Sequence, residues 1–193
     1  MERTTAERAA WWISELYAPA VVATAYLLSR PLVVPGIGWP HALVAVLFTT
    51  VLPFLGVLWF ARGGVVSSRH IPKRRQRYWP FLTSGFSILG GVWTLRLMDA
   101  PDALFLDLGG IFTGLVLCLV ANAFYKVSVH TAVAVYVALQ FLGPVPAVGV
   151  AGLAAAAAVG WSRHVLRAHT PGQVAAGAAI GVATHLLRTL VYG

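Results

Sequence analysis

Acidic side chains are scarce in this chain: its 193 residues include six Asp and Glu against 14 Lys and Arg. All charged residues together make up 10% of the sequence, whereas soluble domains carry roughly a quarter. This shortage argues against a soluble globular protein. Cysteine is almost absent as well, since Cys118 stands alone, which excludes an intrachain disulfide. Inside an apolar run it is typical of a small packing residue.

Long apolar runs take the place of the missing charges. Hydrophobic residues form 59% of the chain, and several runs approach the roughly 20 residues that a helix needs to cross a bilayer. The sequence therefore predicts an all-α integral membrane protein, a bundle of six to seven transmembrane helices in a single domain over residues 1–193. Pro53 is expected to kink the second segment. The expected segments lie at about 12–32, 41–60, 78–97, 103–124, 131–142, 146–161 and 171–192.

The positive residues gather in three polar stretches between these segments. They are the stretch 62–77, which contains no acid, the stretch 126–130 and the stretch 162–173. If seven segments alternate across the membrane, all three stretches fall on one face and the aspartates near residues 99–107 fall on the other. The net charge of +8 is then explained by membrane topology and by anionic lipid headgroups, and no nucleic-acid partner is expected.

The stretch 162–173 contains the start signal of a helix. Thr170 is expected to be the N-cap, Pro171 the first helical residue and Gln173 the third, because Thr-x-x-Gln is a capping box and proline suits a first turn. His169 then precedes a helix N-terminus, where unpaired N–H groups and the helix dipole favour anions. An imidazole in that position, close to Arg163, suits phosphate chemistry. The alternative is that these basic residues only mark the ends of membrane helices.

The spacing of these residues forms a pattern. Ser162-Arg163 is followed after five residues by His169 and after three more by Gln173. This resembles the third motif of the membrane type 2 phosphatidic acid phosphatase family, whose members hydrolyse lipid phosphates and diphosphates. That motif is Ser-Arg, five residues, His, three residues, Asp, so only the last position departs from it.

Two further motifs of the family are matched in part. The second, Pro-Ser-Gly-His, corresponds to Ser128-Val129-His130, which keeps the serine and the histidine. The first, Lys, six residues, Arg-Pro, corresponds to Arg77, with His70 at the lysine position and Lys73 one turn before the arginine. The resemblance covers roughly residues 69–185 and is closest to a divergent branch with a His-Thr-Pro-x-Gln third motif.

The resemblance implies a role for each matched residue. His169 would be the nucleophile that forms a phosphohistidine, and His130 would protonate the leaving oxygen. The phosphate would be bound by a set of basic and hydroxyl side chains, and no metal or cofactor is implied. These side chains are Arg77, Lys73, Lys126, Ser128 and Arg163.

Gln173 is the main departure from the family. The family's aspartate accepts a hydrogen bond from the nucleophilic imidazole and stabilises its positive charge. An amide oxygen accepts the same hydrogen bond but carries no negative charge. Gln173 is therefore expected either to orient His169 as part of the catalytic set or only to complete the capping box. The substrate expected from the resemblance is an isoprenoid or glycerolipid phosphate or diphosphate. A protein of the same fold that binds or transports a lipid phosphate without turnover is the alternative.

The distribution of Lys and Arg predicts the orientation in the cell membrane. Placing the three polar stretches inside puts 11 of the 14 basic residues on the cytoplasmic side and leaves Arg30, Arg96 and Arg188 near the outer ends. The positive-inside rule favours this arrangement, so the site is expected to open toward the cytoplasm.

Overall fold

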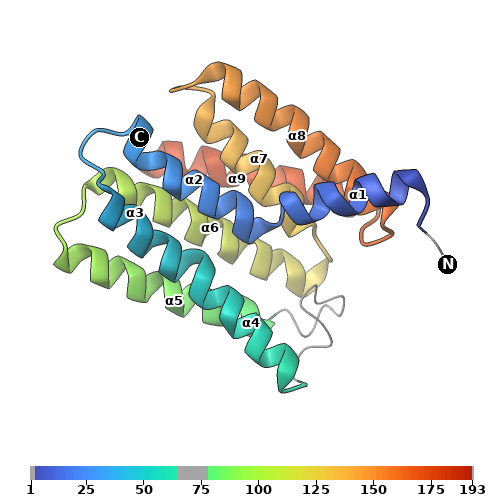
Figure 1. Cartoon of the computed structure of the whole chain (residues 1–193), viewed down its shortest axis with the longest axis horizontal. Coiled ribbons are helices and arrows are strands. Elements are labelled where there is room, and N and C mark those ends of the chain that lie inside the picture. Colours follow the sequence, from blue (N-terminus) through green and yellow to red (C-terminus); the bar gives the residue numbers. More distant parts are fainter. Residues whose placement is uncertain (1–2, 65–77, 193) are drawn as a thin grey trace. The chain divides into compact units, whose positions relative to one another are not determined.

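The computed structural model describes residues 3–64 and 78–192, and the regular structure of these residues is entirely helical (Figure 1). This confirms the all-α class. The helices are α1 Thr5–Leu16, α2 Pro19–Val33, α3 Trp39–Val46, the π-helix η1 Leu47–Val51, α4 Leu52–Arg62, α5 Tyr78–Leu97, α6 Asp102–Phe124, α7 Val129–Phe141, α8 Pro146–Val165 and α9 Pro171–Tyr192.

The first expected segment is two helices rather than one. α1 ends at Leu16, and α2 begins at Pro19 after a bend of 46°. Proline disfavours the helical conformation in the residue before it, so Ala18 is not helical and the new helix begins at the proline itself. A capping box between Thr4 and Glu7 begins α1.

The second expected segment is one continuous apolar helix with a defect in its middle. α3, η1 and α4 together run from Trp39 to Arg62. Pro53 is the second residue of α4, which follows the π-helical turn at Leu47–Val51. Proline lacks an N–H and clashes with the carbonyl four residues earlier, and a wider turn relieves that clash. The expected distortion at Pro53 therefore takes the form of a π-helical turn that precedes the proline.

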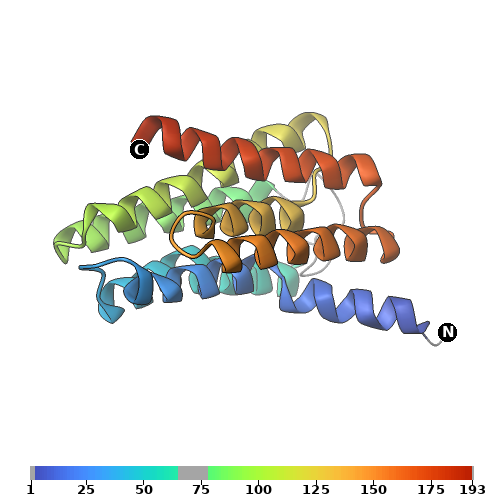
Figure 2. The same cartoon turned by 90° about the horizontal axis from the view of Figure 1, so that it is seen from above.

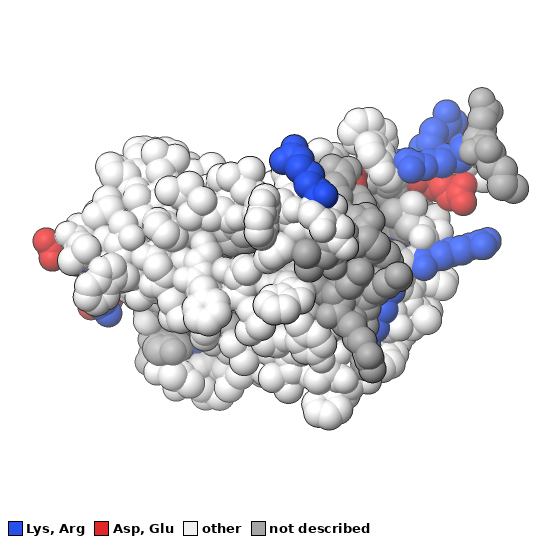
Figure 3. Space-filling view, turned by 90° about the horizontal axis from the view of Figure 1, so that it is seen from below, with Lys and Arg blue, Asp and Glu red and all other residues white. Residues whose placement is uncertain are grey.

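Three of the described helices are long and apolar enough to cross a membrane, namely Trp39–Arg62, Asp102–Phe124 and Pro171–Val191. A fourth span results if the bent pair α1–α2 counts as one. α7 has 13 residues, which at 1.5 Å each gives about 20 Å, less than the hydrocarbon core. Uncharged residues cover most of the surface in Figure 3. Large side chains such as Phe86 and Trp93 are at least 70% exposed, as expected for a surface in contact with lipid.

The chain divides into two compact units. One holds residues 1–22 and 120–193, and the other holds residues 23–119. In the first unit α7 packs against both α8 and α9, and α1 packs against α8 (Figure 2). In the second unit α5 packs against α3, η1 and α4. The expectation of a single domain stays a prediction.

Small residues let α9 approach α7 closely. A Cβ atom at Gly177 would collide with the carbonyl oxygen of Ser128, and one at Gly181 would lie 2.5 Å from the carbonyl oxygen of Ala132. The small-residue spacing on α9 therefore serves helix packing. Its consequence for function is that the first turns of α7 and α9 lie side by side.

Candidate functional site

The segment between α8 and α9 is a compact turn that places His169. Arg167 has a left-handed backbone with φ of 52°, and its N–H donates to the His164 carbonyl at 2.8 Å. The N–H groups of Ala168 and His169 donate to the Arg163 carbonyl at 3.0 and 3.1 Å. These bonds form a Schellman-type helix end, which satisfies the last carbonyls of α8. The turn fixes the backbone of His169 directly before α9.

The predicted capping box at the start of α9 is confirmed. The N–H of Gln173 donates to Thr170 Oγ1 at 3.3 Å, and the N–H of Thr170 donates to Gln173 Oε1 at 3.3 Å. His169 Nδ1 lies 3.1 Å from the same Gln173 Oε1. The two roles considered for Gln173 are therefore compatible, because one oxygen serves the cap and also contacts the imidazole.

This arrangement determines which nitrogen of His169 carries the proton. The backbone N–H of Thr170 requires an acceptor, so the atom of Gln173 that it contacts is the amide oxygen. An oxygen also accepts from Nδ1, which must then be the protonated nitrogen. In the neutral ring the lone pair is then on Nε2. His169 is 6% exposed, so the surrounding protein fixes this orientation.

The stretch 126–130 lies against the turn that carries His169. Lys126 Nζ donates to the Ala168 carbonyl at 2.8 Å, and the N–H of Ser128 donates to the Gln173 carbonyl at 3.1 Å. These bonds bring the stretches 126–130 and 162–173 together. The lysine thus places a positive charge at the carbonyl one residue before His169.

Ser128 acts as the N-cap of α7. It is fully buried, and its Oγ accepts the Thr131 N–H at 3.4 Å. His130 follows in the first turn of α7 and is half-buried. Lys126 and Ser128 both make contacts that join the two segments, and His130 lies in the helix turn that directly follows them. The site thus contains two adjacent helix N-termini, and both dipoles favour an anion there.

Arg163 connects the site to α1. It is 8% exposed and lies in the last turn of α8, and its Nη1 donates to the hydroxyl of Ser14. Ser14 is not recognisable from the sequence, because a bond between α1 and α8 leaves no local signal. Arg77 and Lys73 lie outside the described residues, so their predicted phosphate contacts stay predictions.

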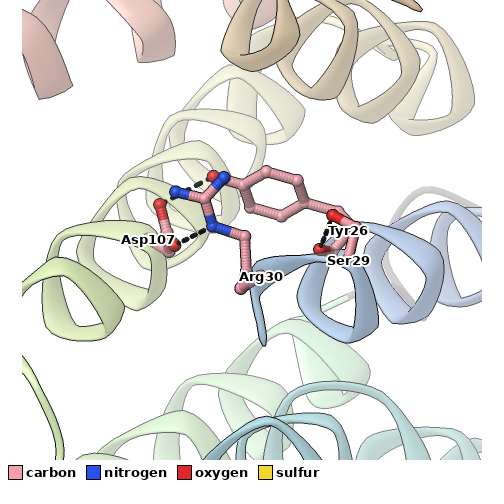
Figure 4. A network of polar contacts seen from close by, with 4 residues as sticks. All are labelled: Tyr26, Ser29, Arg30 and Asp107. Carbon is pink, nitrogen blue, oxygen red and sulfur yellow. Dashed lines mark hydrogen bonds and ion pairs between the residues drawn. The ribbon is translucent and has the colours of Figure 1, made fainter. Parts of the chain in front are cut away.

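A separate polar network in the other unit was also missed. Asp107 on α6 is fully buried and accepts from Arg30 Nε at 2.7 Å and from the Tyr26 hydroxyl at 2.7 Å (Figure 4). Ser29 donates to the Tyr26 carbonyl at 2.6 Å. The sequence does contain a signal for this network, namely one arginine and one aspartate inside apolar runs, because charges in such runs are stable only when paired. It does not indicate that these two residues pair with each other.

The donors of the site suit an anion. Within residues 3–64 and 78–192, no three side chains of the metal-binding types His, Cys, Asp and Glu cluster closely enough to hold a metal ion. The groups that do come together are Lys126, the Arg163 segment, two helix starts and the His169 imidazole. This set can bind phosphate oxygens and offers a nitrogen lone pair beside them. Comparison of the chain with protein-family models, curated proteins and solved structures found no match.

Proposed function

We propose that this chain is a membrane-bound phosphatase for a lipid phosphate or diphosphate and a divergent member of the membrane type 2 phosphatidic acid phosphatase family. The observation that carries the proposal is the bond between His169 Nδ1 and Gln173 Oε1. It requires a proton on Nδ1, which in a neutral imidazole leaves the lone pair on Nε2, and it lies at the start of two helices. A histidine that only marks a helix end has no need of this arrangement.

The proposed reaction has two steps. His169 Nε2 attacks phosphorus in line with the ester oxygen, the P–O bond breaks, and His130 gives its proton to the leaving oxygen. A water molecule then attacks the phosphohistidine, the P–N bond breaks, and His130 takes up the proton that the water loses. The substrate would be an isoprenoid or glycerolipid phosphate. Lys126, Ser128 and Arg163, together with Arg77 and Lys73, would bind the phosphate oxygens, since this chemistry depends on positioning and charge.

The membrane arrangement belongs to the same proposal. The chain would cross the cell membrane with six to seven helical segments and present the site to the cytoplasm. The 11 basic residues assigned to that side support this orientation. Anionic lipids would then be partners of the basic stretch 62–77.

A second function is favoured by one observation, the neutral side chain at position 173. An amide does not stabilise the charge that develops on a nucleophilic imidazole, so a protein that binds or transports lipid phosphate without hydrolysing it would tolerate Gln173. Such a protein would keep the basic residues of the site but would not require the lone pair on His169 Nε2.

The test is phosphate release by the purified protein from a panel of lipid phosphates and diphosphates. His169→Ala should abolish release, and His164→Ala, an exposed histidine in the last turn of α8, is the matched control and should leave it unchanged. His130→Ala should slow release from lipid substrates strongly but from an aryl phosphate only weakly, since an aryl oxide leaves without a proton. Binding of lipid phosphate without any release would support the second function.

A further inference from the structure

Arg163 is held by a residue 149 positions earlier in the chain, Ser14 of α1. Ser14 and Ala10 are four residues apart and therefore share one face of the helix. Both are buried, at 3% and 0% exposed, and α1 packs against α8. Trp12 on the opposite side is 59% exposed. α1 is thus docked on α8 by a narrow face whose polar group meets the arginine.

The hydroxyl of Ser14 accepts from Nη1 and therefore fixes the direction of the guanidinium.

The backbone of Arg163 completes the connection. Its carbonyl accepts the N–H groups of Ala168 and His169, so the residue that Ser14 holds also anchors the nucleophile's segment. Removing the hydroxyl would leave a buried guanidinium N–H without this acceptor, and the side chain would turn to find another. We propose that Ser14 is a positioning residue that aims Arg163 at the phosphate group; this inference rests on the proposed function.

The experiment compares four variants of the full chain in the same detergent. Ser14→Ala removes the hydrogen-bond acceptor, and Ser14→Thr keeps the hydroxyl. Ser14→Cys keeps a side chain of similar volume whose sulfur is a weak hydrogen-bond acceptor. Ser29→Ala is the matched control, because that hydroxyl donates only within its own helix, to Tyr26. The readouts are KM and kcat for a lipid phosphate, the pH profile, the Kd for orthovanadate and the Tm.

Ser14→Ala and Ser14→Cys should raise KM and the Kd for orthovanadate about tenfold, as expected for one lost hydrogen bond to a charged group. The pH profile should not move, because Ser14 touches neither His169 nor Gln173, and Ser14→Thr and Ser29→Ala should behave like wild type. If Ser14→Ala fails to fold, the KM and the Kd for orthovanadate of Ser14→Cys test the positioning role. Wild-type affinities in a folded Ser14→Ala or Ser14→Cys protein would overturn the positioning role and leave the phosphatase intact.

The proposed function can fail separately. Orthovanadate binding that depends on Ser14, without phosphate release by wild type, would uphold the positioning of Arg163 and overturn the phosphatase. Absence of both binding and release in wild type would overturn both.

Discussion

A neutral amide steadies the imidazole of His169 in this chain. Gln173 Oε1 receives two bonds, from His169 Nδ1 and from the Thr170 N–H. It supplies the correct tautomer but no charge to stabilise a positive imidazole. Charge-assisted hydrogen bonds are about twice as strong as neutral ones. The chain therefore fixes the geometry of the proposed nucleophile but lacks the electrostatic stabilisation that a carboxylate would add.

Introducing a carboxylate at position 173 should raise the rate. Gln173→Glu keeps the length of the side chain and the Thr-x-x-Glu capping box, so kcat for a lipid phosphate should rise about tenfold, equivalent to roughly 1.4 kcal/mol. Gln173→Asp is one methylene shorter and should leave kcat intact or raise it less. Steady-state kinetics near neutral pH would show this. A large loss of kcat in a folded Gln173→Glu protein would mean that the amide itself is required.

The buried pair of Arg30 and Asp107 should matter for stability rather than for catalysis. Asp107→Asn leaves a buried guanidinium without its counter-charge, and this should cost about 3–5 kcal/mol. Replacing both residues by Met and Leu should recover most of the loss, because no charge is then left buried. Thermal unfolding in detergent measures the effect. Equal loss of stability in the single and double variants would contradict this account.

At the scale of the helices, the contact between α7 and α9 forms the site. Two glycines on α9 bring its first turns onto the backbone of α7 at Ser128 and Ala132. A second contact lies further along the same helices, where Gln140 Nε2 is 3.0 Å from His185 Nδ1. The pairing of helix starts that creates the candidate anion site is thus a product of helix packing.

Gly177→Ala should damage both packing and activity. The added Cβ meets the Ser128 carbonyl, so α9 must move away from α7, and overpacking of this kind costs about 1–3 kcal/mol. Gly56→Ala is the matched control, since a Cβ there has no neighbour within 4 Å and alanine favours a helix by about 1 kcal/mol. Tm and phosphate release would be measured for both. An unchanged Tm in Gly177→Ala would show that the helices are not in close contact.

Local signals predicted the helices well and their pairings poorly. The expected segments 78–97 and 171–192 match α5 and α9, and the capping box at Thr170 is present, because these features depend on residues close in sequence. The break before Pro19 was missed because an apolar run conceals it. The bonds from Ser14 and Arg30 were missed for a different reason: each joins residues more than 70 positions apart, and no pattern in one sequence sets that register.

For the whole molecule, the predicted orientation follows from the uneven distribution of basic residues. In a Cys118→Ser background, Asp102→Cys should react with an impermeant maleimide on intact cells, since Asp102 is 89% exposed at the start of α6. Arg69→Cys should react only after the membrane is opened, because the basic stretch 62–77 is placed inside. Labelling of position 69 in intact cells would reverse the orientation of the site.

The central claim is that His169 Nε2 becomes phosphorylated during turnover. It is tested by mixing the purified protein with a lipid phosphate that carries a radiolabelled phosphate, stopping the reaction within milliseconds in alkali, and mapping the label on the protein. We predict label on His169 that survives alkali, is lost in acid and is absent from His169→Ala. Release of phosphate by wild type with no label on His169, or release at the wild-type rate by a folded His169→Ala protein, would contradict this account.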